Sequence, residues 1–323
     1  MSQLSRRDLL LGASAGALVT GVGSRFTFLA PSAALADQIE RQGFHRFLVG
    51  DITMTALYDG VWEKPHDPSF IANATVEQTR GALIVAGYSG ENVPIPFSAM
   101  AAEIAGKVVL FDSGTGGQLA PSAGLMRTRN LAAAGIDPTK VSTICLTHYH
   151  PDHIFGLMEQ DTNRPVFPNA EIVVSAAEHA FWTDESTIGK LPEQMRGFAQ
   201  RIQETLGTWT NLRRIEGEAE VLPGVRTMPT FGHTPGHTSY HVFSGDRQLF
   251  ILGDVSNMPA LFLRHPEWHA VFDMDPEKAE EVRRLTMDRA IAERAMVAGY
   301  HYPFPAAGTV TKDGDGYMFV PIV

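Results

Sequence analysis

Short runs of apolar residues, broken by polar positions, predict β-strands within 46–60 and 96–114. Further strands are expected at 143–150, 170–176, 227–234, 238–245, 248–255 and 316–323. Helical spacing falls between them, at 128–135, 175–184 and 191–207, and a long helix is expected from Asp275-Pro276 to a stop at Gly299. Strands first follow one another and then alternate with helices. This order favours an α/β protein with helices packed outside sheets over a single doubly wound sheet.

The first segment of the chain has the pattern of an export signal. Arg6 and Arg7 precede a mildly apolar run at 9–22, which is too short to cross a bilayer of about 30 Å at about 1.5 Å per residue. Ala34 and Ala36 occupy the small positions that a signal peptidase needs. The segment resembles a twin-arginine signal peptide. We therefore expect residues 1–36 to be a signal, with cleavage after Ala36, and the mature protein to be periplasmic or secreted.

A buried N-terminal helix is the alternative interpretation of this segment. Four glycines lie between positions 12 and 23, and each would weaken such a helix by about 1 kcal/mol. The export signal is therefore the favoured interpretation. No linker or repeat follows residue 37, which predicts a single domain over 37–323.

Composition narrows the class of protein. The chain has 323 residues, 44% of them hydrophobic, which is the composition of a globular protein. Its formal net charge of −10 argues against a nucleic-acid binder, because such proteins neutralise phosphates with Lys and Arg. The single cysteine, Cys145, excludes an internal disulfide and is expected to be a small core residue.

The stretch THYHPDHIFG concentrates side chains that bind metals. His148, His150, Asp152 and His153 lie within six residues, directly after an apolar run. On a strand, His148 and His150 would point the same way, and Pro151 would then turn the chain. Imidazole and carboxylate are ligands that borderline-soft divalent ions prefer. The cluster therefore predicts metal binding.

Further ligands are expected downstream, because these residues cannot fill two metal sites. The stretch GHTPGHT offers His233 and His237, either of which is a candidate ligand. Asp254 ends the apolar run ILGD, where a carboxylate would be exposed at a strand end and able to bridge two ions. His301 follows the long predicted helix.

These motifs, in this order, resemble those of the metallo-β-lactamase superfamily over about residues 45–323. The resemblance implies a four-layer αββα sandwich and a dinuclear centre, with zinc as the first expectation and manganese, iron or cobalt also suited. It implies that His148, His150 and His233 bind the first metal ion. Asp152, His153 and His301 are then implied ligands of the second.

The resemblance also implies a bridging carboxylate and a supporting residue, and it leaves three histidines without a family position. Asp254 is implied as the bridge between the two ions, and His233 is preferred over His237 as the ligand. Asp112, in VLFDSG, resembles a supporting residue that is not a ligand. The other histidines, His241, His265 and His269, match no family position and are expected at the surface or the pocket rim.

Within the superfamily, the chain resembles the methyl parathion hydrolase group and its relatives among exported lactonases and aryl esterases. This resemblance implies a hydrolase in which a metal-bridging hydroxide opens lactones or cleaves aryl esters, with Asp152 and Asp254 as catalytic carboxylates and phosphotriesters as further substrates. It also implies a homodimer. The alternatives are a dedicated organophosphate triesterase and, from another class, a non-catalytic metal-binding protein of the same fold. We expect the protein to bind a small neutral substrate and no nucleic acid. We also expect it to have no membrane span after processing.

Aromatic residues between the metal motifs are candidates for the pocket wall. In the group that the chain resembles, equivalent segments contribute aromatic walls for aryl-bearing substrates. The candidates are Trp182, Phe198, Trp268 and Phe272. Ordinary core packing is the alternative for each of them.

Overall fold

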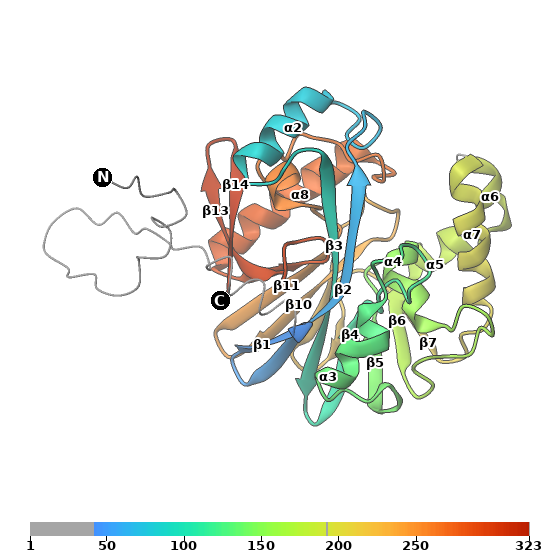
Figure 1. Ribbon diagram of the computed structural model, residues 1–323. Helices are drawn as coiled ribbons and strands as arrows, with labels where there is room; N and C mark the ends of the chain where they lie inside the picture. Colours follow the sequence, from blue (N-terminus) through green and yellow to red (C-terminus); the bar gives the residue numbers. More distant parts are fainter. Residues whose placement is uncertain (1–41, 192, 323) are drawn as a thin grey trace, which may run out of the picture. The chain divides into compact units, whose positions relative to one another are not determined.

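The computed structural model describes residues 42–191 and 193–322. The predicted signal segment, 1–36, and its cleavage site lie outside these residues. Two seven-stranded sheets form the centre of the described part of the chain (Figure 1). The first contains, in spatial order, β1 (Phe44–Val49), β2 (Ile52–Pro65), β3 (Asn92–Ile104), β4 (Lys107–Phe111), β5 (Val141–Cys145), β6 (Glu171–Ser175) and β7 (Leu212–Ile215).

The second sheet is built from the C-terminal half of the chain. It contains β14 (Gly316–Pro321), β13 (Ala307–Asp313), β12 (Met296–Gly299), β11 (Arg247–Gly253), β10 (Thr238–Ser244), β9 (Val225–Pro229) and β8 (Glu220–Leu222). The first sheet is antiparallel from β1 to β4 and parallel from β4 to β7, whereas the second has antiparallel pairs on both sides of one parallel pair. The parallel pairs are β4–β5, β5–β6 and β6–β7 in the first sheet and β11–β12 in the second.

Alternating apolar positions make the first sheet hydrophobic on both faces. Met100 and Ala102 of β3 belong to a core shared with the second sheet, whereas Ala99 and Ala101 belong to a separate outer core. This period of two is what successive side chains of a strand produce. Cys145 points into the shared core, where it is completely buried, as the sequence predicts.

Helices cover the outer faces. Those after the first sheet's strands are α2 (Val76–Val85), α3 (Leu131–Ala133), α4 (Pro151–Ile154), α5 (Ala176–Thr183), α6 (Glu185–Lys190) and α7 (Glu193–Leu206). Trp182 of α5 and Ile202 of α7 belong to the outer core of the first sheet. The long helix α8 (Pro276–Glu293) packs on the second sheet through Met287 and Ala290 (Figure 1). The predicted α/β fold with helices outside two sheets is therefore confirmed, and it is compatible with a four-layer sandwich.

Three predicted boundaries are wrong, and one of them is that of the strand predicted at 227–234, which ends at Pro229. The long helix does not run to Gly299: it ends at Glu293, where Arg294 takes a left-handed conformation with φ of 54°. Residues Met296–Gly299 form β12 instead, because they pair with β11 inside the second sheet. The strand predicted at 143–150 ends at Cys145, so His148 and His150 lie in the loop that follows it.

No helix among the described residues combines the length and the apolar character that crossing a bilayer requires.

Candidate metal centre

The ends of parallel strands carry most of the candidate ligands. His148 and His150 follow β5, and Asp152 and His153 lie in α4 directly after them. In the second sheet, Asp254 follows β11 and His301 follows β12. Because the carboxyl ends of parallel strands share one edge of a sheet, the two sheets present these side chains to the same space.

The remaining candidate comes from a turn. His233 lies between β9 and β10, and Met274 N donates to its carbonyl at 3.0 Å. The neighbouring Asp275 N donates to Gly232 O at 2.9 Å. The start of α8 therefore holds this turn over the centre.

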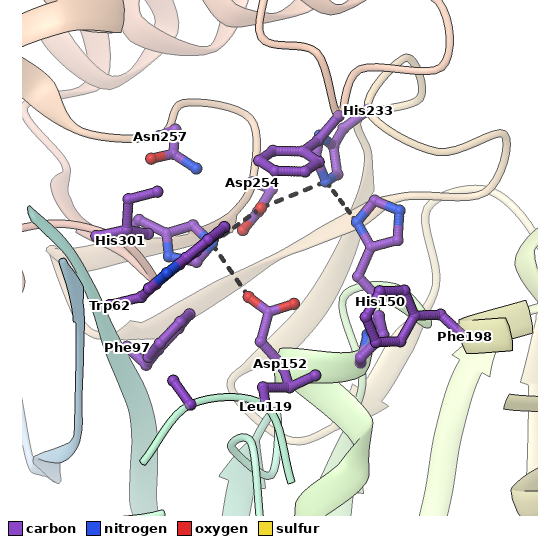
Figure 2. A pocket seen from close by; sticks show the side chains of 14 residues that line it. Trp62, Phe97, Leu119, His150, Asp152, Phe198, His233, Asp254, Asn257 and His301 are labelled. Atoms are coloured by element: carbon purple, nitrogen blue, oxygen red, sulfur yellow. Dashed lines mark hydrogen bonds and ion pairs between the residues drawn. The ribbon is translucent and has the colours of Figure 1, made fainter. Parts of the chain in front are cut away.

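The folded chain gathers all seven predicted ligands into three overlapping groups. Within each group, one ligand atom from every residue lies within 4.8 Å of the others. The groups are His148, His150 and His233; His148, His153 and Asp254; and Asp152, His153 and His301. Figure 2 shows five of these side chains at the base of a cavity, with dashed lines from His233 to His150 and from His301 to Asp152.

Hydrogen bonds fix the orientation of three imidazole rings. His153 Nδ1 lies 2.8 Å from Asp112 Oδ2, and His233 Nδ1 lies 2.7 Å from Asp273 Oδ1. His301 Nδ1 donates to the carbonyl of Pro96 at 2.9 Å. In each ring the Nδ1 atom is thereby engaged, which leaves Nε2 directed at Asp254 in the cluster. Ligating histidines in proteins are commonly held in this way.

His237 has both ring nitrogens occupied outside the cluster. Its Nδ1 lies 2.9 Å from Thr230 Oγ1, and its Nε2 accepts a hydrogen bond from Asp254 N at 2.9 Å. Neither nitrogen has a lone pair left for an ion. His237 therefore supports the backbone at Asp254, whereas His233 Nε2 lies inside the cluster, 2.9 Å from His150 Nδ1.

Burial keeps two of the rings neutral. Burial, assisted by the neighbouring His233, lowers the pKa of His150 to about 3. Burial and His153 lower the pKa of His148 well below its usual value. Because a histidine must be unprotonated to bind a metal, both rings are available as ligands at neutral pH.

On the side of the cluster that carries the carboxylates, charged neighbours outweigh burial and favour the ionised forms. Burial opposes a charged imidazole, but Asp152, Asp112 and Asp254 outweigh it and raise the pKa of His153 well above its usual value. Burial likewise opposes ionisation of Asp254, yet His301 and His153 hold the pKa of that carboxyl well below its usual value. The site thus concentrates negative charge that protons or metal cations can balance.

Unpaired polar atoms support a fit to metal ions. Within the described residues, the buried Nε2 atoms of His148 and His150 have no hydrogen-bond partner, and the buried His153 Nε2 and Asp254 Oδ1 contact each other only as an ion pair at 3.2 Å. Buried polar groups are rarely left unsatisfied. Five imidazoles and two carboxylates also form the mixed nitrogen and oxygen donor set that zinc and similar ions prefer. The residues present therefore fit two divalent ions.

A cavity of about 250 Å³ opens above the cluster. Besides cluster residues, its lining is mainly apolar: Trp62, Ile95, Phe97, Leu119, Ala120, Pro151, Phe198 and Phe272, together with Asn257. Phe198 and Phe272 thus take the predicted positions in the wall. Among the described residues that line the cavity, none is Lys or Arg.

Trp182 and Trp268, the other two aromatic residues predicted for the wall, do not line the cavity. Trp182 is 1% exposed, and its Nε1 donates to the buried carboxylate of Glu178 at 2.8 Å. Trp268 is 7% exposed and stacks on His265 at 4.0 Å between ring centroids. Both side chains belong to the outer core of the first sheet, so core packing, the alternative interpretation, holds for them.

Two buried carboxylates beside the cluster carry no recognisable signal in the sequence. Asp273 orients His233, and the guanidinium of Arg283 lies 3.3 Å from its other oxygen. Glu178 accepts hydrogen bonds from Tyr149 N, Trp182 Nε1, Thr234 Oγ1 and Gly236 N, and thereby links the two loops that carry His148, His150 and His233. Asp273 lies two residues before Asp275, which caps α8, and Glu178 is placed within a helix. Neither had a local motif that marks it.

A family model and curated sequences match parts of the chain. The model of the metallo-beta-lactamase superfamily matches residues 98–292. An N-acyl homoserine lactonase of a Bacillus species is 31% identical over 109 residues, which cover 34% of this chain and 36% of that protein. The chain thus aligns with only about a third of the length of this relative.

Solved structures match most of the chain. AidC, a dizinc quorum-quenching lactonase in complex with an N-acyl homoserine product, superimposes with a TM-score of 0.82 at 24% identity. The hydrolase AbOPH of the beta-lactamase superfamily superimposes with a TM-score of 0.80 at 28% identity. Each comparison covers 87% of this chain and 98% of the other.

Proposed function

The chain belongs to the metallo-beta-lactamase superfamily, and on this premise we propose that it is a dinuclear metal-dependent hydrolase that opens neutral lactones, with N-acyl homoserine lactones as the first substrate class to test. One observation carries the proposal: a cluster of metal-type ligands forms the floor of a cavity whose walls are mainly apolar and, among the described residues, contain no Lys or Arg. Similarity to N-acyl homoserine lactonases supports the choice of substrate class.

Two divalent ions, when bound, would polarise the substrate carbonyl and lower the pKa of a water molecule to near neutrality. The residues of the chain would hold this centre rigid, since Asp112, Asp273 and the carbonyl of Pro96 fix the ligand rings. The apolar walls would exclude other water molecules. In this proposal Asp152, the more exposed of the two cluster carboxylates, takes a proton from the attacking water and returns it to the leaving alkoxide oxygen.

The cavity walls favour an uncharged substrate. A charged substrate would lose its hydration in the apolar cavity without gaining an ion pair from a Lys or Arg side chain of the wall. An acyl chain or an aryl group would instead bury against Phe97, Phe198 and Phe272. These aromatic rings also favour a second candidate function, the hydrolysis of aryl esters or aryl phosphotriesters such as methyl parathion.

Purified mature protein loaded with defined zinc, manganese, iron or cobalt would test these functions. The assays would use N-hexanoyl homoserine lactone, a γ-lactone, dihydrocoumarin, p-nitrophenyl acetate, methyl parathion and a cephalosporin. We expect lactones to give the highest kcat/KM. Turnover of the cephalosporin alone would refute the lactonase and triesterase proposals together. Binding of fewer than one ion per chain would favour a non-catalytic protein.

We also propose that the protein is exported by the twin-arginine route and acts in the periplasm or outside the cell. The adjacent Arg6 and Arg7 and the small residues Ala34 and Ala36 support this proposal. Replacement of both arginines by lysine should retain the precursor in the cytoplasm, and fractionation would detect it. A homodimer, suggested by the family resemblance, would be tested by light scattering.

A further inference from the structure

Asn257 is a polar residue of the cavity wall that the proposed function does not use. It lies three positions after Asp254, in the loop that follows β11, and its side chain faces the cavity beside Asp254 and His301 (Figure 2). It is 8% exposed, so its amide is largely withdrawn from bulk water.

Hydrogen bonds fix which end of the amide faces the cavity. Met258 N donates to Asn257 Oδ1 at 2.8 Å, and a backbone N–H can only be paired with the oxygen of the amide. Ser256 Oγ donates to the carbonyl of Asn257 at 3.1 Å and restrains the backbone. The Nδ2 group is therefore turned away from the loop, and Figure 2 shows it on the side of Asp254.

The N–H groups of this Nδ2 have no hydrogen-bond acceptor within the described residues. No hydrogen bond from it is found within the described residues, although the neighbouring Oδ1 is paired. Most other polar side chains of the wall belong to the metal cluster, and the indole of Trp62 is the remaining one. A preorganised donor beside a reactive centre stabilises negative charge that develops on a substrate oxygen.

We propose that Asn257 is a catalytic residue whose Nδ2–H donates to the carbonyl oxygen of the bound lactone or ester. The inference rests on the proposed hydrolase function and deepens it. As the water oxygen bonds to the carbonyl carbon, the carbonyl electron pair moves onto the carbonyl oxygen. The Nδ2–H of Asn257 donates a hydrogen bond to that oxygen. The pair returns when the ester C–O bond breaks, and the alkoxide takes up the proton that water has lost. The product is a hydroxy acid.

The substitution Asn257→Leu tests this role, because leucine is similar in size, removes the donor and adds no charged ligand near the cluster. Asn92→Leu is the matched control: Asn92 is exposed at the start of β3 and does not line the cavity. On N-hexanoyl homoserine lactone, we expect kcat of Asn257→Leu to fall by about 10²–10³-fold, with a much smaller change in KM. Metal content and unfolding midpoint should match those of wild type.

A second measurement does not depend on turnover. In protein labelled with [¹⁵N]Asn, the side-chain amide signal missing from Asn257→Leu identifies Nδ2. Addition of the ring-opened product, N-hexanoyl homoserine, should shift this signal, whereas the signal of Asn92 should stay unchanged.

The outcomes separate this role from the proposed function. A wild-type enzyme that hydrolyses the lactone, with an Asn257→Leu variant within threefold of its kcat, would overturn the role of Asn257 alone. Loss of metal from Asn257→Leu would also overturn it, since the residue would then hold the centre instead of the substrate. A wild-type protein that neither hydrolyses nor binds any ester or lactone would overturn the proposed function, and this inference with it.

Discussion

The buried pair of Asp273 and His233 offers a direct test of how the chain prepares its metal ligands. Asp273 Oδ1 lies 2.7 Å from His233 Nδ1, and both side chains are almost completely withdrawn from solvent. The substitution Asp273→Asn preserves the shape of the side chain and an oxygen that can accept from His233. It removes the negative charge that strengthens this hydrogen bond and that faces Arg283.

The contacts of Asp273 set the expected loss of zinc affinity and of stability. Loss of a partner that orients a metal-bound histidine commonly costs about 10–100-fold in metal affinity, or about 1.4–2.7 kcal/mol. Removal of one partner from a buried ion pair destabilises a protein by about 3–5 kcal/mol. Arg283 also donates to the carbonyls of Val255, Pro266 and Trp268, which partly compensate its charge. We therefore expect the cost in stability to lie at the lower end of that range.

Zinc affinity would be measured by competition with a chromophoric chelator, and stability by urea unfolding of the metal-free proteins. Asp246→Asn is the matched control, because Asp246 is exposed in the turn between β10 and β11. Asp273→Asn should bind one of its two zinc ions at least tenfold less tightly than wild type, and Asp246→Asn should not differ. Wild-type affinity for both ions in Asp273→Asn would refute the role assigned to this carboxylate.

Four further predictions concern the core, the wall and the ions. Glu178→Ala leaves four donors without their acceptor and should lower the free energy of unfolding by about 3 kcal/mol or more; a urea midpoint equal to wild type would contradict this. Phe198→Ala should raise KM for p-nitrophenyl esters while metal content stays the same, whereas Trp182→Ala should cost about 3–5 kcal/mol of stability because Trp182 lies in the core. Burial raises the pKa of Cys145, so its thiol should react with a disulfide reagent at pH 8 only after unfolding; rapid reaction in the native protein would contradict the packing. Zinc binding should release protons, measurable in weak buffer, because carboxylates raise the pKa values of His153 and His301 against the effect of burial.

The sequence was most informative where ligands are close together in the chain. His148, His150, Asp152 and His153 share one loop and one helical turn, so their proximity follows from their spacing alone. Asp254 could be placed because it ends an apolar run that could only be a buried strand. The choice of His233 over His237 depended on resemblance, and the structure supplies its physical reason in the two occupied nitrogens of His237.

Contacts between distant segments explain what the sequence did not predict. Asp273 reaches His233 because the start of α8 hydrogen-bonds to the turn at Gly232, a pairing that no local pattern encodes. Residues 296–299 continue an apolar helical pattern and become a strand only because β11 offers a parallel partner. Trp182 faces inward because its indole N–H meets the buried Glu178, whose position was equally unpredictable.

The Gly253-Asp254 pair joins the two sheets at the metal centre through backbone geometry. Gly253 has φ of 54°, and a Cβ there would lie 2.7 Å from His237 Nε2 and 2.8 Å from Thr147 Cβ. Only glycine allows β11 to approach both at once. That approach lets Asp254 N donate to His237 Nε2, while Thr147 O accepts from Thr238 N. Thr147 immediately precedes His148, so the same contact that sets Asp254 also fixes the loop that carries the first ligands. The position of Asp254 relative to the loop of His148 and His150 is therefore set where the two sheets meet.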